Sequence, residues 1–355
     1  MIIRQLSGLI VLFALSCVAQ SAVILQYHHV SDDTPASTST SPALFKQHLQ
    51  YLAENDFTVK SLTDVMAALE AGESLPDKTV VLTFDDSYRS IYDTAFPLLQ
   101  EFKFPFTVFI NTAPVGSSPQ DFMRWEEIKT MSDAGVVIAN HTHSHPHMVR
   151  LKNDETREQW RQRIGEEIAI TEEAITKHTG QNHKLLAYPY GEYDSEVIKL
   201  LRALGFKGIG QHSGAVGAGS NLYAVPRFPM GGDFGNMADF PSKVFSMPLP
   251  HAAVAWQDAL GESLSDATVT ADDRPILVLT LEDDSLAEGL TCYFRGGLMT
   301  KEIMGKEVRV QTETGLSAGR SRYNCTAQDA VSGRFYWFSQ PWLVKGRDGR
   351  WQHQN

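Results

Sequence analysis

The chain has 355 residues, 43% of them hydrophobic, and its 31 Lys and Arg against 42 Asp and Glu give a formal charge of −11. This apolar content excludes a disordered chain, and the acidic balance without any run of Lys or Arg excludes a typical nucleic-acid-binding protein. At roughly 150 residues per domain, the length predicts two domains, or one large barrel with an appendage.

The N-terminus has the pattern of a secretory signal peptide. Arg4 is basic, residues 9–15 are apolar but too few to span a bilayer, and Ala19-Gln20-Ser21 is a small-residue cleavage site. We therefore expect residues 1–21 to be removed and the mature protein to be periplasmic or secreted, with a lipid anchor at Cys17 as the alternative. No second apolar run of membrane length follows, so no membrane span is expected.

Strand-like and helix-like segments alternate from residue 23 to residue 227. Apolar runs predict strands over residues 23–27, 79–84, 106–110, 136–138, 185–188, 208–210 and 223–225. Apolar residues at helical spacing predict helices that start at Ser41-Pro42, span residues 62–69 and 91–99, begin at Trp125, and end at Gly180 and Gly205. This alternation predicts an α/β barrel or doubly wound sheet, with its chemistry at the carboxyl ends of the strands.

The composition changes after about Pro250. Short β-rich runs at residues 276–281, 291–294, 308–311 and 335–338 are separated by Gly and Asp turns, with no convincing helix. They predict a β-sandwich of about 100 residues. We expect a barrel domain over residues 22–230, a linker over 231–250 and the β-domain over 251–355. The aromatic residues of the last run, with Trp342, are interpreted as core, and a sugar-stacking platform is the alternative.

Two cysteines remain once Cys17 leaves with the signal peptide. They are Cys292 and Cys325, and disulfides persist in the compartments outside the cytoplasm. We expect a Cys292–Cys325 disulfide, and two buried thiols are the alternative.

Carboxylates and histidines follow two of the predicted strands. Asp85 and Asp86 end one strand, where alternation points them in different directions, so one could bind a metal while the other acts as a base. Residues 140–147, with four histidines, follow another strand. Taken alone, the two aspartates could belong to a turn and the histidines to a surface cluster. Taken together, they form a set of nitrogen and oxygen ligands that suits zinc or another divalent metal. Thr142 and Pro146 exclude a zincin helix.

Thr83-Phe84-Asp85-Asp86 and His141-Thr142-His143-Ser144-His145-Pro146 resemble the first two motifs of the polysaccharide deacetylase (NodB homology) family, carbohydrate esterase family 4. The motifs occur in the family's order and are about 55 residues apart. The resemblance covers roughly residues 23–227. It implies a distorted (β/α) barrel and metal-dependent hydrolysis of an acetyl group from a sugar.

The resemblance also implies roles for individual residues. By motif position, Asp86, His141 and His145 are the metal ligands and Asp85 is the general base. The implied metal is zinc, with cobalt, nickel or manganese as alternatives. His143 and His147, which match no ligand position, are expected to be surface histidines.

The third family motif, Arg-x-Pro-Tyr, is only partly present, as Ala187-Tyr188-Pro189-Tyr190. The backbone N–H of Tyr190 is therefore an expected oxyanion donor. In the family the arginine orients the base, so Ala187 in its place leaves open how Asp85 is held. The Asp-Trp motif and the late Leu-x-His that supplies the general acid are not found.

A general acid is available at the first strand instead. Tyr27-His28-His29-Val30 resembles the Tyr-His-x-Val segment of the poly-N-acetylglucosamine deacetylase subgroup, in which an N-terminal histidine is the proposed acid. The first strand of a closed barrel lies beside the last, so His28 is the expected acid and His212 its competitor. Either could simply be a strand-end histidine. The expected substrate-binding residues are Pro189, Gln211, His212 and Ser213.

The expected function is hydrolytic deacetylation of an N-acetylhexosamine glycan such as a polymer or oligomer of N-acetylglucosamine, so the expected partner is an acetylated glycan. The alternatives are an O-acetyl esterase acting on a polysaccharide such as xylan and a non-catalytic glycan-binding protein. Because a deacetylated amino-glycan is cationic, the acidic surface could also attract the product. Linkage, chain length and oligomeric state stay open.

Overall fold

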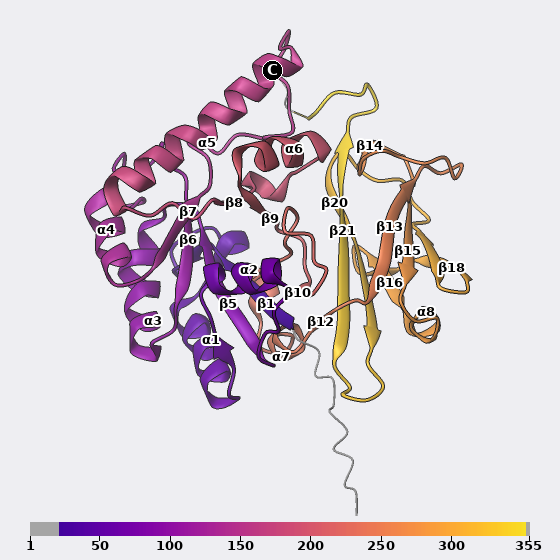
Figure 1. Ribbon diagram of the computed structural model, residues 1–355, viewed down its shortest axis with the longest axis horizontal. Helices are drawn as coiled ribbons and strands as arrows, with labels where there is room; N and C mark the ends of the chain where they lie inside the picture. The colour runs from indigo at the N-terminus through magenta and orange to yellow at the C-terminus, as the bar shows by residue number, and fades with distance from the viewer. Residues whose placement is uncertain (1–20, 353–355) are drawn as a thin grey trace, which may run out of the picture.

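A computed structural model describes residues 21–352 and contains an α/β domain beside an all-β domain (Figure 1). The α/β domain is drawn in indigo to rose on one side of the picture, and the all-β domain in orange to yellow on the other. None of the helices between residues 21 and 352 has the length and apolarity needed to cross a membrane. The expected signal peptide and Cys17 lie outside the described residues, except for Ser21, which is the first residue of β1.

One curled sheet organises the α/β domain. In the described part of the chain its strand order is β10-β1-β5-β6-β7-β8-β9, with β11 pairing with β1 and β4 with β5. All pairs are parallel except β1 with β10. The strands are β1 (Ser21–Tyr27), β4 (Thr58–Val59), β5 (Thr79–Asp85), β6 (Phe106–Ile110), β7 (Val137–Asn140), β8 (Leu185–Ala187), β9 (Lys207–Ile209), β10 (Ala215–Gly217) and β11 (Phe228–Pro229). The predicted α/β class with a distorted barrel is confirmed.

Helices cover this sheet, and their ends follow the expected signals. They are α1 (Pro42–Glu54), α2 (Leu62–Ala71), α3 (Phe96–Phe102), α4 (Trp125–Asp133), α5 (Arg157–Thr179), α6 (Ser195–Leu204) and α7 (Phe240–Val244). Short helical turns lie at η1 (Ala36–Thr38), η2 (Ile91–Ala95), η3 (Pro189–Gly191) and η4 (Gly232–Gly235), and a small ladder joins β2 (His29–Val30) to β3 (Ser39–Thr40). Ser41 caps α1 by accepting from the N–H of Leu44, and Gly180 ends α5 with φ 78°.

One strand prediction in this domain is wrong. Residues 223–225 contribute only an isolated bridge between Val225 and Ile209. The N–H groups of Tyr223 and Ala224 donate to the side-chain and backbone oxygens of Asn221, so of these three residues only Val225 bonds to Gly208 of β9 and to Gly210, which follows this strand.

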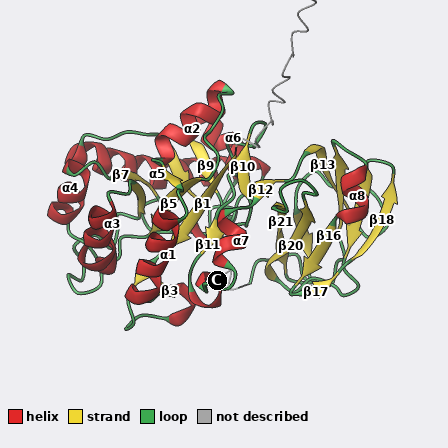
Figure 2. Cartoon of the chain, turned by 90° about the horizontal axis from the view of Figure 1, so that it is seen from below, coloured by secondary structure: helices red, strands yellow, loops and turns green. Residues whose placement is uncertain are grey.

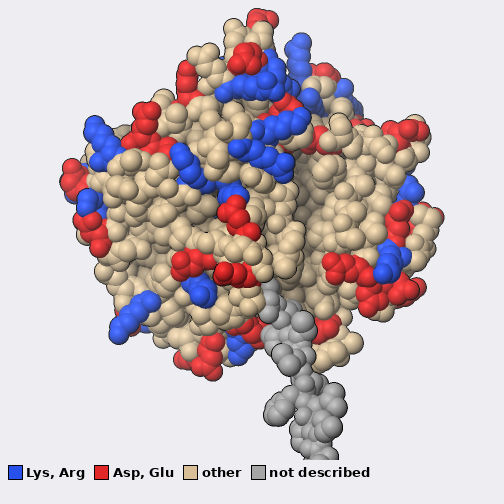
Figure 3. Space-filling model, in the orientation of Figure 1, with Lys and Arg blue, Asp and Glu red and all other residues tan. Residues whose placement is uncertain are grey.

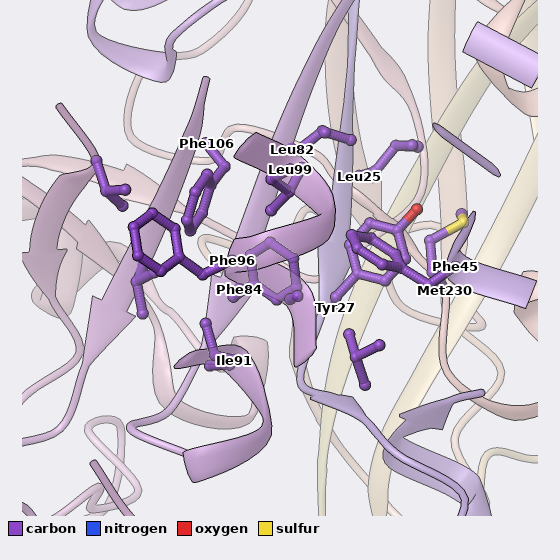
Figure 4. Close-up of a cluster of buried hydrophobic side chains, with 14 of the residues drawn as sticks. Leu25, Tyr27, Phe45, Leu82, Phe84, Ile91, Phe96, Leu99, Phe106 and Met230 are labelled. Carbon is purple, nitrogen blue, oxygen red and sulfur yellow. The ribbon is translucent and has the colours of Figure 1, made fainter. Parts of the chain in front are cut away.

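The apolar runs of β1 and β5 are continuous because both faces of these strands are buried. Leu25, Tyr27, Leu82 and Phe84 pack on one side, against α1, α3 and their neighbours (Figure 4). The intervening residues, including Ile24, pack on the other side. A central parallel strand covered on both faces accounts for the lack of polar alternation.

The β-domain consists of two sheets that face each other (Figure 2). One has the order β12-β21-β20-β16-β17 with β14 on β21, and the other has the order β13-β15-β19-β18. The elements are β12 (Met247–Pro248), β13 (His251–Gln257), β14 (Thr268–Thr270), β15 (Ile276–Leu281), α8 (Ser285–Gly289), β16 (Thr291–Phe294), β17 (Gly297–Leu298), β18 (Thr300–Met304), β19 (Glu307–Gln311), β20 (Gly319–Gln328) and β21 (Phe335–Lys345). The expectation of no helix is corrected by α8, a single short turn.

Aromatic residues of β21 pack on both sides of the strand. Trp342 is fully buried in the β-domain core, which Tyr336 and Phe338 also contact. Trp337 faces the α/β domain instead, and its ring lies 5.0 Å from that of Phe228. These contacts agree with the core interpretation for four of the aromatic residues, whereas Phe335, at the start of the strand, is exposed. They also show that β21 forms part of the contact between the domains.

A disulfide joins Cys292 to Cys325. The two residues are direct partners in the ladder between β16 and β20, and both are buried. The disulfide therefore cross-links two strands of one sheet.

The segment 231–250 is folded. It contains η4, α7 and β12, and Phe240 and Val244 are buried in the core of the α/β domain. Its last strand, β12, pairs with β21. This segment therefore packs against one domain and extends the sheet of the other.

The buried side chain of His48 is expected to make the free energy of unfolding smaller at acidic pH. His48 is fully buried, its Nε2 donates to the carbonyl of Gly235 (2.6 Å), its Nδ1 accepts from the hydroxyl of Tyr27 (3.0 Å), and burial lowers its pKa from 6.5 to about 4. A lowered pKa means that this contribution to stability is complete above pH 6.5 and is lost as the pH falls towards 4. We expect the difference in the free energy of unfolding between the wild type and His48→Gln to shrink over this window, by on the order of 3 kcal/mol. Urea denaturation at pH 7 and pH 4.5 measures this, and an unchanged difference would contradict it.

Candidate active site

The candidate site lies at the carboxyl ends of neighbouring strands of the curled sheet (Figure 1). Asp85 is the last residue of β5 and Asp86 follows it, while His141 follows directly after β7. Only β6 separates these two strands. Parallel strands end at the same edge of a sheet, so this topology brings together residues that are far apart in the sequence.

Asp86, His141 and His145 form a compact group. Each can offer a ligand atom, and the three atoms lie within 4.8 Å of one another. The Nε2 atoms of His141 and His145 are each 3.8 Å from Oδ1 of Asp86. Two imidazole nitrogens and one carboxylate oxygen leave positions open for water and substrate on a first-row divalent metal.

The protonation of the two histidines fits metal binding. Nδ1 of His141 donates to the carbonyl of Ala187 (2.7 Å), which leaves Nε2 as the lone-pair nitrogen, and that atom is buried without a partner in the described chain. Burial lowers the pKa of His145 to about 4, and a protonated His141 would act in the same direction, so the ring of His145 is neutral at physiological pH. Because metals bind imidazole through a lone-pair nitrogen, His145 and the unpartnered Nε2 of His141 are available as ligands.

Four non-glycine residues around this group have left-handed backbone. They are Asp86 (φ 69°), Thr142 (φ 65°), His145 (φ 57°) and Tyr190 (φ 60°). This conformation is most unfavourable for the β-branched Thr142, whose N–H is held by the side chain of Asn140 (2.9 Å). Strained backbone of this kind concentrates at functional sites, where the surrounding fold maintains it.

Asp85 is held by an arginine from elsewhere in the sheet. Nη1 and Nη2 of Arg227 donate to its two carboxylate oxygens, both at 2.7 Å, and Nε2 of Gln26 donates to Oδ2 at 2.6 Å. Both ionic side chains are fully buried. Burial alone would raise the pKa of Asp85, but the charge and hydrogen bonds of Arg227, with the charges of His141 and His28, hold it well below its usual range. Asp85 is therefore ionised.

Arg227 and Gln26 are the functional residues that the sequence reasoning missed. Arg227 lies directly before β11, which pairs with β1 on one side of β5. Ala187, which replaces the arginine of the third motif, ends β8 on the other side of β5. The available signals were weak. They are a single arginine between Pro226 and Phe228, and a single amide in the apolar strand β1. A charged or amide group in a buried run needs a partner inside the fold.

The structure places the two candidate acids differently. His28 follows Tyr27, which pairs with Phe84, so it lies beside Asp85 at the end of the sheet. Burial lowers the pKa of His28, while the charges of Asp85 and Asp86 act in the opposite direction. Both carboxylates of the site therefore act on this imidazole.

His212 lies away from the group of Asp86, His141 and His145. Burial, with the charges of Arg322 and Arg227, lowers its pKa to about 3. Its ring lines a pocket between the two domains, as does Gln211. Pro189 and Ser213, the other expected substrate-binding residues, do not line this pocket.

The remaining residues of the histidine tract have defined partners. His143 bonds to the hydroxyl of Thr112 (2.8 Å). His147 pairs with Glu192 (2.8 Å) and stacks on the ring of Tyr190 with centroids 4.0 Å apart. The ring of Tyr190 in turn contacts His145, at 4.4 Å. His147 is thus part of the wall next to the candidate metal group.

Residues 72–209 match the sequence model of the family described as polysaccharide deacetylase. The chain is 26% identical over 232 residues to the poly-beta-1,6-N-acetyl-D-glucosamine N-deacetylase of Staphylococcus aureus (strain MRSA252), covering 60% of this chain and 80% of the relative. It is 25% identical over 244 residues to the protein of the same name from Escherichia coli (strain K12), covering 58% of this chain and 36% of that protein.

Solved structures share the fold. The Streptococcus pyogenes deacetylase PplD in complex with acetate superposes with a TM-score of 0.55 at 23% identity, covering 62% of this chain and 98% of that one. IcaB from Ammonifex degensii superposes with a TM-score of 0.52 at 26% identity, covering 63% and 95%. Together with the aspartates and histidines at the ends of β5 and β7, these matches show that residues 72–209 are similar to the polysaccharide deacetylase family.

Proposed function

We propose that this protein is a metal-dependent hydrolase that removes acetyl groups from an N-acetylhexosamine glycan, an N-acetylglucosamine polymer or oligomer, and releases acetate. The observation that carries the proposal is the group of Asp86, His141 and His145 directly beside the buried pair of Asp85 and Arg227. The names of the relatives, which are N-deacetylases of poly-beta-1,6-N-acetyl-D-glucosamine, support this substrate class.

In this proposal Asp86, His141 and His145 hold a divalent metal, zinc in the first instance, with cobalt, nickel or manganese as alternatives. A bound ion of this kind supplies Lewis-acid chemistry, which polarises the acetyl carbonyl and makes water more acidic. The bond from His141 to the carbonyl of Ala187 fixes the ring so that Nε2 faces Asp86.

Asp85 acts as the general base. The contacts with Arg227 and Gln26 fix its carboxylate, and its Oδ1 has Arg227 as a single hydrogen-bond partner, which leaves a lone pair for the proton of the attacking water. The backbone N–H of Tyr190 is proposed to donate to the oxyanion that forms on the acetyl carbonyl. The arrangement of charge around Asp85 keeps it in the form that can accept a proton.

His28 acts as the general acid. An amine leaves poorly unless it is protonated, so amide cleavage needs an acid more than cleavage of an activated ester does. His28 lies beside Asp85 at the end of β1. Burial lowers its pKa, and the charges of Asp85 and Asp86 counteract part of that shift.

We expect His28→Ala to lower acetate release from N-acetylglucosamine oligomers by about 100-fold or more, while hydrolysis of an aryl acetate falls far less. The aryl oxide leaves without a proton, so the two substrates separate loss of the acid from loss of the site. His143→Ala is the matched control and should retain both activities, because His143 bonds to Thr112 instead of joining the catalytic group. A selective loss of amide hydrolysis in His212→Ala, with none in His28→Ala, would make His212 the acid.

An acetate-release screen of the metal-loaded protein tests the proposed function. The substrates are β-1,4 and β-1,6 N-acetylglucosamine oligomers, peptidoglycan and acetylated xylan. Release from the amide substrates supports the proposal. Release from xylan alone would make the protein an O-acetyl esterase, and glycan binding without acetate release would make it a binding protein.

We further propose that the mature protein is periplasmic or secreted. The pattern of residues 1–21 supports this location, although the structure describes only Ser21 of them. The disulfide between Cys292 and Cys325 agrees with an oxidising compartment. Fractionation of cells expressing the full chain, with N-terminal sequencing, tests the location and the cleavage site.

A further inference from the structure

A pocket of about 650 Å³ lies between the α/β domain and the β-domain. Its wall includes Arg150, Tyr190 and Glu192 from the first domain and Arg320 and Arg322 from β20 of the second. The pocket adjoins the candidate active site, because the ring of Tyr190 contacts that of His145. A sugar unit next to the one at the metal group would therefore reach this pocket.

Positive charge is in excess in the pocket wall. Three arginines face one carboxylate, that of Glu192, which is itself buried. His147 (2.8 Å), Arg150 (3.5 Å) and Arg320 (3.9 Å) already surround this carboxylate. Glu192 is therefore already paired with these three side chains and forms no ion pair with Arg322.

Arg322 lacks an acidic partner. Its guanidinium donates from Nη1 to the carbonyl of Gln211 (2.8 Å), and among residues 21–352 it forms no ion pair with a carboxylate. Burial and the nearby charge of Arg320 lower its pKa, which reflects two like charges in a partly desolvated wall. A charge in such surroundings is costly unless an opposite charge compensates it.

Other polar atoms of the same wall are also unsatisfied. Nε of Arg150 and Nδ1 of His212 are buried and have no hydrogen-bond partner among the described residues. Buried polar atoms are normally bonded, and exceptions of this kind mark places where a water, an ion or a ligand group belongs. Their concentration in one pocket points to a bound polar group.

We propose that this pocket is an anion-binding subsite of the glycan site, which takes a carboxylate-bearing sugar next to the N-acetylhexosamine at the metal group. This inference rests on the proposed function and adds a substrate class to it. The guanidinium of Arg322, with Arg320 beside it, binds the sugar carboxylate through charge-assisted hydrogen bonds. The same charges repel a sugar that is already deacetylated and cationic, so the β-domain selects the stretches of glycan that the enzyme processes.

Isothermal titration calorimetry with the full metal-loaded chain tests the subsite. The two ligands are an alternating N-acetylglucosamine–glucuronic acid tetrasaccharide and a neutral N-acetylglucosamine tetramer. We expect the acidic ligand to bind wild type roughly tenfold tighter at low salt, with the preference decreasing as salt increases. Arg322→Gln and Arg320→Gln should each reduce this preference, and Arg322→Lys should retain part of it.

The control is Arg274→Gln, which removes the same charge from an exposed residue of the β-domain outside the pocket and should leave the preference unchanged. Arg320 has a side chain that is 51% exposed, so its variant should fold even if substitution of Arg322 perturbs the domain. Equal affinity of the two ligands for the wild type, or an undiminished preference in both glutamine variants, would overturn the subsite.

Acetate release from the neutral tetramer, measured alongside, separates the two proposals. Release without any preference for the acidic ligand would leave the proposed function standing and remove the subsite. A preference for the acidic ligand that depends on Arg320 and Arg322, without acetate release from either ligand, would retain the subsite and remove the proposed function.

Discussion

Arg227→Gln is expected to lower acetate release by about 100-fold or more and to destabilise the protein by about 3–5 kcal/mol. The substitution leaves the carboxylate of Asp85 in a fully buried position without its charged partner. It also removes the two hydrogen bonds that Arg227 donates to this carboxylate, and of these three contacts only the bond from Gln26 remains. Urea denaturation and the rate of acetate release from N-acetylglucosamine oligomers measure the two effects.

A second ion pair of the same type provides the control. Arg334 pairs with Asp77 at 2.7 Å, but the Asp77 side chain is 39% exposed, so Arg334→Gln should cost less than about 1 kcal/mol and leave activity unchanged. The double variant Arg227→Met with Asp85→Asn should regain stability relative to Arg227→Gln, because no unpaired charge remains, but it should stay inactive. Full activity of Arg227→Gln would show that Asp85 needs no partner to act.

His141→Ala is expected to abolish metal binding and to lower acetate release by about 1,000-fold or more, because several kcal/mol of transition-state stabilisation are lost. Chelation of the wild type should have the same effect, and addition of zinc, cobalt, nickel or manganese should show which metal restores activity. Bound metal, measured by atomic emission after dialysis, provides a second readout that does not depend on catalysis.

His143→Ala is the matched control for the metal prediction. This histidine belongs to the same tract but bonds to Thr112, outside the group of Asp86, His141 and His145. The variant should keep stoichiometric metal. Retention of metal by His141→Ala, or undiminished activity of the chelated wild type, would show that these residues do not form the metal site.

The face shown in Figure 3 is not uniformly acidic. Acidic and basic side chains are interspersed on it, and Lys and Arg gather over the upper part of the α/β domain. Next to the candidate site the excess charge is positive, from Arg150, Arg320 and Arg322. We therefore expect the local charge of this pocket to affect ligand binding more than the net charge of the chain does.

Several features of this protein were predictable from the sequence because they depend on neighbouring residues. Ser41 caps the start of α1 and Gly180 ends α5, and both effects depend on local contacts. The apolar run of β5 predicts a strand that is buried on both faces. The proximity of the carboxylates and histidines at the ends of β5 and β7 was also predictable from the sequence. Parallel strands of one sheet share an edge, so a position at a strand end already predicts proximity.

The tertiary structure alone decided how Asp85 is held and what lies beside the group of Asp86, His141 and His145. Arg227 reaches Asp85 across 142 positions of the chain, and Arg322 of the β-domain reaches Gln211 across 111. No local pattern specifies such pairs, because they depend on which strands become neighbours and on how two domains pack together. The sequence determined the chemistry of the site, through motifs at strand ends, while the fold determined the charges that surround it, through contacts between distant segments.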